Sequence, residues 1–166
     1  MSTAIVGGGI TTASWVLNLS VVGDYARLDP VDHLDEIAAH LGLTGSGVAM
    51  MTAVPVDRRQ VVEVDGAVVT ATVGVGTPTW AADPDSSVRN GPVTPGTINI
   101  IAAVPAGFEQ GAMVNLVTTI TEAKTQALIE GGVAGTGTAT DAVCVVGDRR
   151  GPRQPFGGSR SEWGTR

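Results

Sequence analysis

Residues Gly135–Val146 read GTGTATDAVCVV, a polar, glycine-rich segment that turns directly into an apolar run. The apolar run predicts a buried strand over Ala142–Val146. Two glycines and three threonines precede Asp141, which is more polar chemistry than a connecting turn requires. We therefore expect the loop to contact a ligand. Its glycines would let the backbone approach the ligand, its hydroxyls would bind it, and Asp141 would do acid–base or anchoring work.

A long helix is predicted just before this loop, from about Glu109 to Ile129, and two glycines end it. Lys124 falls near the middle of its apolar stripe, which is an unusual place for a lysine. One interpretation is that the stem packs while the ammonium reaches water. The other is that the ammonium is partly buried and needs an anionic partner, for which Asp141 is the nearest candidate in sequence. The stripe itself comprises Met113, Leu116, Val117, Ile120, Ala123, Ala127 and Leu128.

The opposite side of this helix carries Glu122, close to Thr118 and Thr125. An ordinary solvated face is one interpretation. The many threonines argue for another, because threonine is a mediocre helix former and a merely solvated face favours Glu, Lys and Gln. With Thr97 and Asn99 just upstream, the pattern indicates a polar but largely uncharged surface for a large ligand rich in amides or hydroxyls.

Apolar runs and turn residues predict the remaining elements. A second helix is expected to have Asp29 as N-cap, Pro30 at its first position and Gly42 after its end. Asp65-Gly66 predicts a two-residue hairpin turn. The proline-rich segment 77–95 is interpreted as a long surface loop that covers the ligand site as a lid. Strands are predicted over residues 3–6, 14–22, 47–53, 60–64, 67–75 and 96–105.

These elements predict a single α/β layered domain over residues 1–166. Two main helices and about seven strands must share one core, and the hairpin makes the sheet mixed rather than purely parallel. A four-layer αββα sandwich is the alternative architecture.

Composition limits the function. The chain has 166 residues, 43% of them hydrophobic and 16% charged, which is not a disordered composition. Its net charge of −6 argues against nucleic acid as a partner. No apolar run reaches the ~18 residues of a membrane span, and no signal peptide is recognisable, so we expect a cytoplasmic protein. Surplus apolar surface favours a homodimer. The single cysteine, Cys144, is expected in the core.

Two segments imitate known sites. IVGGGITTA at residues 5–13 resembles a dinucleotide-binding loop, but it lacks the third glycine and is followed by a predicted strand rather than a helix. His33, Glu36 and His40 lie along one edge of the first helix, where two imidazoles and a carboxylate are possible metal ligands. Their spacing is not that of H-E-x-x-H, and a solvated helix edge is the favoured interpretation. We expect no metal site.

Three motifs together resemble a known family: GTINIIAAV at 96–104, TEAKTQAL at 121–128 and GTGTATDAVCV at 135–145. They are similar to the adenosylcobinamide amidohydrolases. AIVGGG at 4–9, the later LN and GVAMMTA segments, and FGGSRSEWG at 156–164 are similar as well, so the resemblance covers nearly the whole chain. Family members extend beyond both of its ends, and we expect a single domain that is shortened at both ends.

The resemblance implies a cobalamin-salvage enzyme. Such an enzyme hydrolyses the amide that links aminopropanol to the corrin ring of adenosylcobinamide, giving adenosylcobyric acid. The corrinoid substrate brings its own cobalt, so no separate cofactor is implied. Glu122, Lys124 and Asp141 are the expected catalytic residues. The expected substrate-binding residues are Gly8, Gly9, Asn18, Thr97, Asn99, Thr121, Thr125, Gly137, Thr138 and Thr140.

The chemistry of amide hydrolysis leaves two mechanisms open. A carboxylate, Glu122 or Asp141, activates water, and backbone N–H groups of the glycine-rich loop face the oxyanion. In the rival mechanism Thr138 is the nucleophile. Lys124 stabilises charge or holds Asp141 in either case. The alternative function is a non-catalytic module that binds a corrinoid or another amide-rich ligand.

Overall fold

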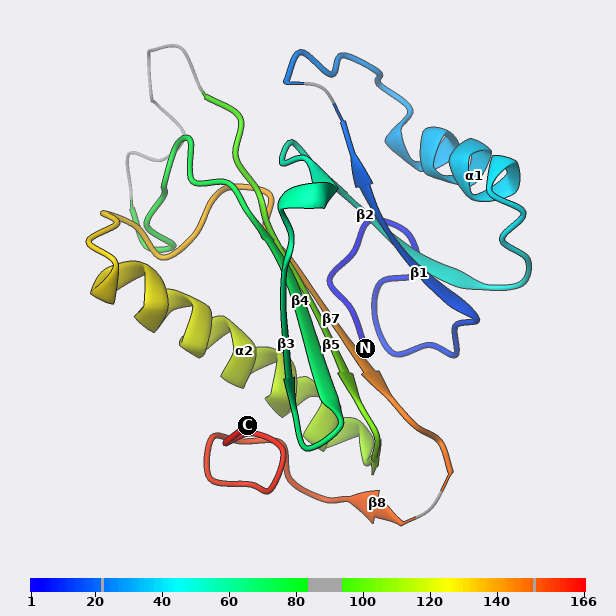
Figure 1. Cartoon of the computed structure of the whole chain (residues 1–166), viewed down its shortest axis with the longest axis vertical. Coiled ribbons are helices and arrows are strands. Elements are labelled where there is room, and N and C mark those ends of the chain that lie inside the picture. The colour runs from blue at the N-terminus through cyan, green and yellow to red at the C-terminus, as the bar shows by residue number, and fades with distance from the viewer. Residues whose placement is uncertain (22, 84–93, 151) are drawn as a thin grey trace.

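The computed structural model of the chain describes residues 1–21, 23–83, 94–150 and 152–166 (Figure 1). Helices and strands follow the predicted order, except that the strand predicted over residues 3–6 is not formed and that two short strands and a 3₁₀ turn are added. The lid predicted over residues 77–95 falls largely on residues 84–93, which lie outside the described residues. The elements are β1 Trp15–Ser20, α1 Pro30–His40, β2 Gly47–Thr52, η1 Val56–Arg58, β3 Gln60–Val64, β4 Ala67–Val73, β5 Ile98–Val104, β6 Gly107–Phe108, α2 Gln110–Glu130, β7 Ala142–Gly147 and β8 Arg153–Gln154.

The main sheet has the strand order β3-β4-β5-β7. β3, β4 and β5 pair antiparallel, whereas β5 and β7 pair parallel, so the sheet is mixed as predicted. The parallel pair requires a crossover, and α2 supplies it. β1 and β2 form a second, parallel sheet. Asp65 and Gly66 both have positive φ, 51° and 80°, as the predicted hairpin turn requires.

The side chains of β7 alternate between two cores. Val143 and Val145 pack against α2, together with Phe108, Ala112 and Leu116. On the other face, Ala142 and Cys144 pack against Ala4, Val48 and Met50, which joins the main sheet to β2. Figure 1 shows α1 beyond β1 and β2, on the side away from the main sheet. The molecule is thus a layered α/β domain, and its helix–sheet–sheet–helix order matches the αββα alternative.

The N-terminal segment forms isolated bridges rather than the strand predicted over residues 3–6. Ser2 pairs with Cys144 on β7, and Val6 pairs with Ala49 on β2. Gly7, with φ of 65°, lies next to Gly47 so closely that a Cβ would collide with the carbonyl of Gly47. The chain therefore leaves β7 after a few residues and crosses to the second sheet, which prevents a regular strand.

Asp29 stands at the N-cap position of α1, but its side chain makes no capping bond. Arg27 instead donates to both carboxylate oxygens of Asp29, at 2.9 and 2.6 Å, and these bonds lower the pKa of Asp29 to about 2. The same guanidinium binds Glu36, while His33 bonds to the hydroxyl of Tyr25 at 3.0 Å. The described residues contain no cluster of three or more possible metal ligands.

The C-terminal tail, predicted as a loop, contains the short strand β8. It pairs with β6 just before α2 begins. Thr119 on α2 also donates to the carbonyl of Gly157, at 3.0 Å, so the tail is bound both by β6 and by α2. Among the described helices, none is both long and apolar enough to cross a membrane.

Cys144 is buried, with 1% of its surface exposed, as predicted. Burial raises the pKa of its thiol, so the reactive thiolate is disfavoured. We expect a chromogenic disulfide reagent to leave the native protein unmodified. In denaturant it should react with Cys144 and release one equivalent of its coloured thiolate per chain. Rapid reaction of the native protein would show that the β7 core opens.

Candidate active site

The loop that returns from α2 places Asp141 directly before β7. Its carboxylate accepts four hydrogen bonds, from the Lys124 ammonium at 2.5 Å, the Thr138 hydroxyl at 2.5 Å, the Thr138 N–H at 3.1 Å and the Ile98 N–H at 2.9 Å. Donors thus come from α2, from the loop and from the first residue of β5. Asp141 holds these three elements together.

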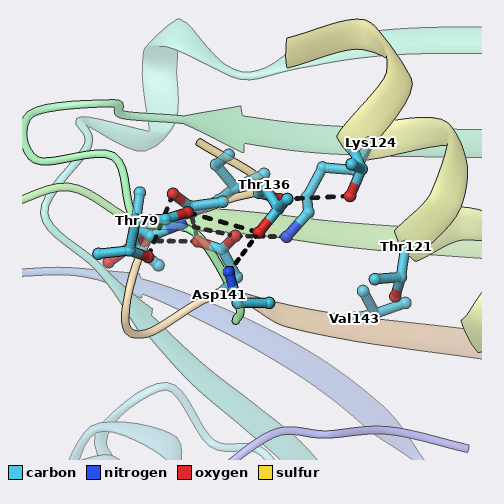
Figure 2. A network of polar contacts seen from close by, with 12 residues as sticks. Thr79, Thr121, Lys124, Thr136, Asp141 and Val143 are labelled. Atoms are coloured by element: carbon cyan, nitrogen blue, oxygen red, sulfur yellow. Dashed lines mark hydrogen bonds and ion pairs between the residues drawn. The ribbon is translucent and has the colours of Figure 1, made fainter. Parts of the chain in front are cut away.

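Lys124 reaches Asp141 from α2, as Figure 2 shows. Only 12% of the lysine side chain and 11% of the aspartate side chain are exposed. The second interpretation of Lys124 is therefore confirmed, because its ammonium is largely buried and paired with Asp141. An ammonium has three N–H donors. Asp141 takes one of them, and no other acceptor among the described residues binds this nitrogen.

Gly137 makes this close arrangement possible. A Cβ at this position would lie 2.6 Å from the Lys124 nitrogen and would also collide with the Asp141 carboxylate. The backbone of Gly137 thus lies directly against the ion pair, where no side chain fits.

We predict that Gly137→Ala lowers the free energy of unfolding by about 1–3 kcal/mol, because the ion pair must shift. Gly111→Ala is the matched control, since a Cβ there meets nothing within 4 Å and alanine favours helix. Thermal unfolding of both variants is the measurement. Equal midpoints for the two would contradict the tight fit.

Backbone pairing holds the glycine-rich loop against residues 79–81. Thr79 donates its N–H to Gly137 at 2.9 Å and accepts the N–H of Thr136 at 2.8 Å (Figure 2). The hydroxyl of Thr125, on α2, donates to the Thr136 carbonyl at 3.3 Å. The N–H groups of Gly135, Thr136 and Thr138 are all bonded within the fold. The N–H of Gly137 makes no hydrogen bond among the described residues, and oxyanion binding by this loop stays a prediction.

Two more predicted binding residues lie beside Asp141, where Thr97 and Thr140 share a hydrogen bond between their hydroxyls at 2.8 Å. Thr121 lies on α2 one turn before Lys124, and its hydroxyl donates to the carbonyl of Val117 at 2.8 Å. Thr118 bonds the preceding helical turn in the same way. Much of the hydroxyl richness of α2 is therefore satisfied by backbone.

Asn18 and Asn99 meet between the two sheets. Asn99, which is 1% exposed, donates to Asn18 Oδ1 and to the Met51 carbonyl, both at 2.8 Å. Asn18 in turn donates to the hydroxyl of Thr72, at 3.1 Å. Thr72 was not anticipated, although its inward position on β4 follows from strand alternation. This buried network joins β1, β4 and β5, and substrate binding by the two asparagines stays a prediction.

The remaining predicted residues are not brought to Asp141. Glu122 is exposed on α2 and has no partner among the described residues. Gly9 pairs with Ser2 in the N-terminal bridge. Gly8 lies against Ala4, whose carbonyl oxygen would be 2.6 Å from a Cβ. Nothing in these contacts links the two glycines to the ion pair.

A cleft of about 740 Å³ lies at the opposite end of β7. Its walls include Trp15, Phe108 and Met113, with Arg149 and Arg153 among its polar residues. β7 has six residues, so this end is about 20 Å from Asp141 at ~3.3 Å per residue. None of the predicted catalytic residues lines the cleft. Asp141 is the candidate site, because a hydroxyl, a carboxylate and a lysine converge there and at no other place among the described residues.

A hydroxyl that donates to a carboxylate, itself oriented by a further group, is the arrangement with which hydrolases attack carbonyl carbon. Thr138, Asp141 and Lys124 have this arrangement. The chain belongs to the adenosylcobinamide amidohydrolase family, whose model matches residues 1–166. By class it is an enzyme that hydrolyses an amide.

Two relatives carry the same description. The adenosylcobinamide amidohydrolase of Methanosarcina mazei is 30% identical over 168 residues, which cover 96% of this chain and 79% of the relative. That of Halobacterium salinarum is 30% identical over 165 residues, which cover 95% of this chain and 70% of the relative. No solved structure matches the chain.

Proposed function

We propose that this protein hydrolyses the amide joining aminopropanol to the corrin ring of adenosylcobinamide, giving adenosylcobyric acid and free aminopropanol. Membership of the family supports the substrate. The observation that carries the chemistry is the Thr138 hydroxyl, 2.5 Å from a carboxylate that Lys124 and two backbone N–H groups hold in place. The corrinoid brings its cobalt as part of the substrate.

Thr138 is the proposed nucleophile rather than a water activated by Asp141. A carboxylate has about four lone pairs. In Asp141 all of them accept hydrogen bonds from the protein, so none is left to bind an attacking water. One of the four donors is a hydroxyl, which is itself a nucleophile once its proton is taken. The geometry therefore favours the threonine mechanism.

Each step then conserves atoms and charge. Asp141 takes the proton of Thr138 Oγ1 as this oxygen bonds to the amide carbon. The carbonyl oxygen becomes an oxyanion, and the carbon–nitrogen bond breaks as Asp141 returns the proton to the leaving aminopropanol nitrogen. Water hydrolyses the resulting ester, giving the corrinoid carboxylic acid and regenerating the hydroxyl.

Lys124 has two roles in this scheme. Its ion pair fixes the orientation of Asp141, and its remaining ammonium N–H groups are available to the oxyanion. The lysine also offsets the charge of a carboxylate that is nearly buried. Asp141 is the general base in this scheme, and Glu122 has no role in the reaction.

Glu122→Gln tests that assignment. Because Glu122 is exposed and makes no contact with the described site, we expect turnover within about 3-fold of wild type and unchanged stability. Steady-state rates with adenosylcobinamide are the measurement. A fall of about 100-fold would instead identify Glu122 as the general base.

The proposed function itself is tested by incubating adenosylcobinamide with the protein in the dark and separating the corrinoids by chromatography. We expect adenosylcobyric acid to appear together with an equal amount of aminopropanol. Tight binding of adenosylcobinamide without either product would support the non-catalytic module instead.

A further inference from the structure

The strand β3, Gln60–Val64, is an open edge of the main sheet. Among the strands of the described residues it pairs with β4 alone, and all five of its residues are exposed. Val61 and Val62 point to opposite faces of the sheet and are 54% and 59% exposed. Such an edge carries a row of unpaired backbone groups that another strand can bind. This exposed edge, with its β-branched apolar residues, is therefore suited to pair with another strand.

The hairpin register identifies which backbone groups face outward. The two-residue turn makes Val64 and Ala67 a pair that exchanges both backbone hydrogen bonds. Alternate residues of β3 share that direction, so Gln60, Val62 and Val64 bond to β4. Val61 and Glu63 therefore direct their N–H and C=O groups away from the sheet, toward any strand that approaches the edge.

The charged residues along this edge are arranged so that two antiparallel copies of the strand can pair opposite charges. Arg59 precedes the strand, and its guanidinium makes one hydrogen bond, to the Val56 carbonyl at 3.2 Å. Glu63 has no partner within the described part of the chain. Asp65 beyond the strand is already paired, with Arg166 at 2.8 Å. One basic and one acidic side chain thus flank Val61 at two residues' distance on either side, each available to a partner.

We propose that β3 pairs antiparallel with β3 of a second copy of this chain, with Val61 opposite the second copy's Val61. This register joins the outward backbone groups of the two valines and sets Glu63 of each copy opposite Arg59 of the other. With Glu63 opposite Glu63, like charges would meet. With Val61 opposite Glu63, Arg59 would face Asp65, which Arg166 already holds.

The size of the contact predicts a weak dimer. A standard stable interface buries about 1,600 Å². Five residues from each copy bury less than that, so we expect a dissociation constant of about 1–100 µM, with the two main sheets continuous across the two-fold axis. The contact involves no residue of the proposed active site, so it can be tested independently of activity.

Sedimentation velocity across the range of about 1 to 500 µM is the experiment. We expect wild type to pass from monomer to dimer, and Arg59→Glu to weaken the dimer at least 10-fold because it sets two acids opposite each other. Adding Glu63→Arg to that variant exchanges the charges and should restore the wild-type constant. Asp35→Arg, on the exposed side of α1, is the control and should change nothing.

These changes lie on exposed side chains, and circular dichroism checks that each variant keeps its fold. The proposal is overturned if wild type stays monomeric throughout the range. It is also overturned if Arg59→Glu dimerises as wild type does, or if the double variant dimerises no better than Arg59→Glu alone.

Discussion

Thr138→Val is expected to lower the turnover of adenosylcobinamide at least about 1,000-fold while the fold is kept. Valine has the shape of threonine but no oxygen to attack the amide carbon. The substitution also removes the hydrogen bond from the Thr138 hydroxyl to Asp141, which we expect to cost about 1–2 kcal/mol of stability. The decisive quantity is the rate constant for turnover at saturating substrate, because loss of a nucleophile acts there.

Two companion variants make that result specific. Thr138→Ser keeps the hydroxyl and should retain measurable turnover, well above that of the valine variant. Thr118→Val removes a hydroxyl that bonds only within α2, to the carbonyls of Val114 and Asn115 and to the Asn115 side-chain amide, and its rate should equal that of wild type. Thr138→Val with a rate near wild type would exclude the threonine mechanism and return the role of nucleophile to water.

Asp141→Asn has the second largest expected effect, and it acts on both rate and stability. Asparagine keeps one acceptor oxygen, but its amide nitrogen cannot accept the two bonds made to the other carboxylate oxygen, either those from Lys124 and the Thr138 N–H or those from Ile98 and the Thr138 hydroxyl. The lysine charge also loses its counterion. We expect turnover to fall at least about 100-fold. Leaving a nearly buried ammonium unpaired should cost about 3 kcal/mol, or about 6–12 °C in the melting midpoint of a chain of this length.

Lys124→Met tests whether the loss of stability comes from the ion pair. Its side chain lies within the apolar stripe of α2, yet the structure shows that methionine would leave the Asp141 carboxylate without its cation. Thermal unfolding should therefore show a comparable loss of stability. If Asp141→Asn and Lys124→Met both unfold at the wild-type temperature, the ion pair does not hold this loop in place.

Local sequence patterns predicted most of the fold. The apolar stripe of α2, the apolar run of β7 and the Asp65-Gly66 turn each depend on neighbouring residues, which explains why they were recognised. The N-terminal bridges and β8 were missed, because a few residues gain their structure only from strands that are distant in sequence. The same holds for the burial of Asn99 between the sheets.

The candidate site was predicted in part. Lys124 within an apolar stripe and Asp141 at the end of a polar loop indicated their ion pair. The contacts of Thr79 with the loop and the need for glycine at 137 were not visible, since both depend on how closely separate segments approach. Glu122 was selected by its motif, although its position opposite the apolar stripe already allowed the solvated face that the structure shows.

The covalent intermediate offers the most direct test of the proposed mechanism. Wild-type protein would be mixed with excess adenosylcobinamide in the dark, quenched in acid during the first turnovers, digested and examined by mass spectrometry. The account predicts a corrinoid ester on the peptide that contains Thr138, absent in Thr138→Val. Turnover with all corrinoid free in solution, or with the ester on another residue, would contradict it.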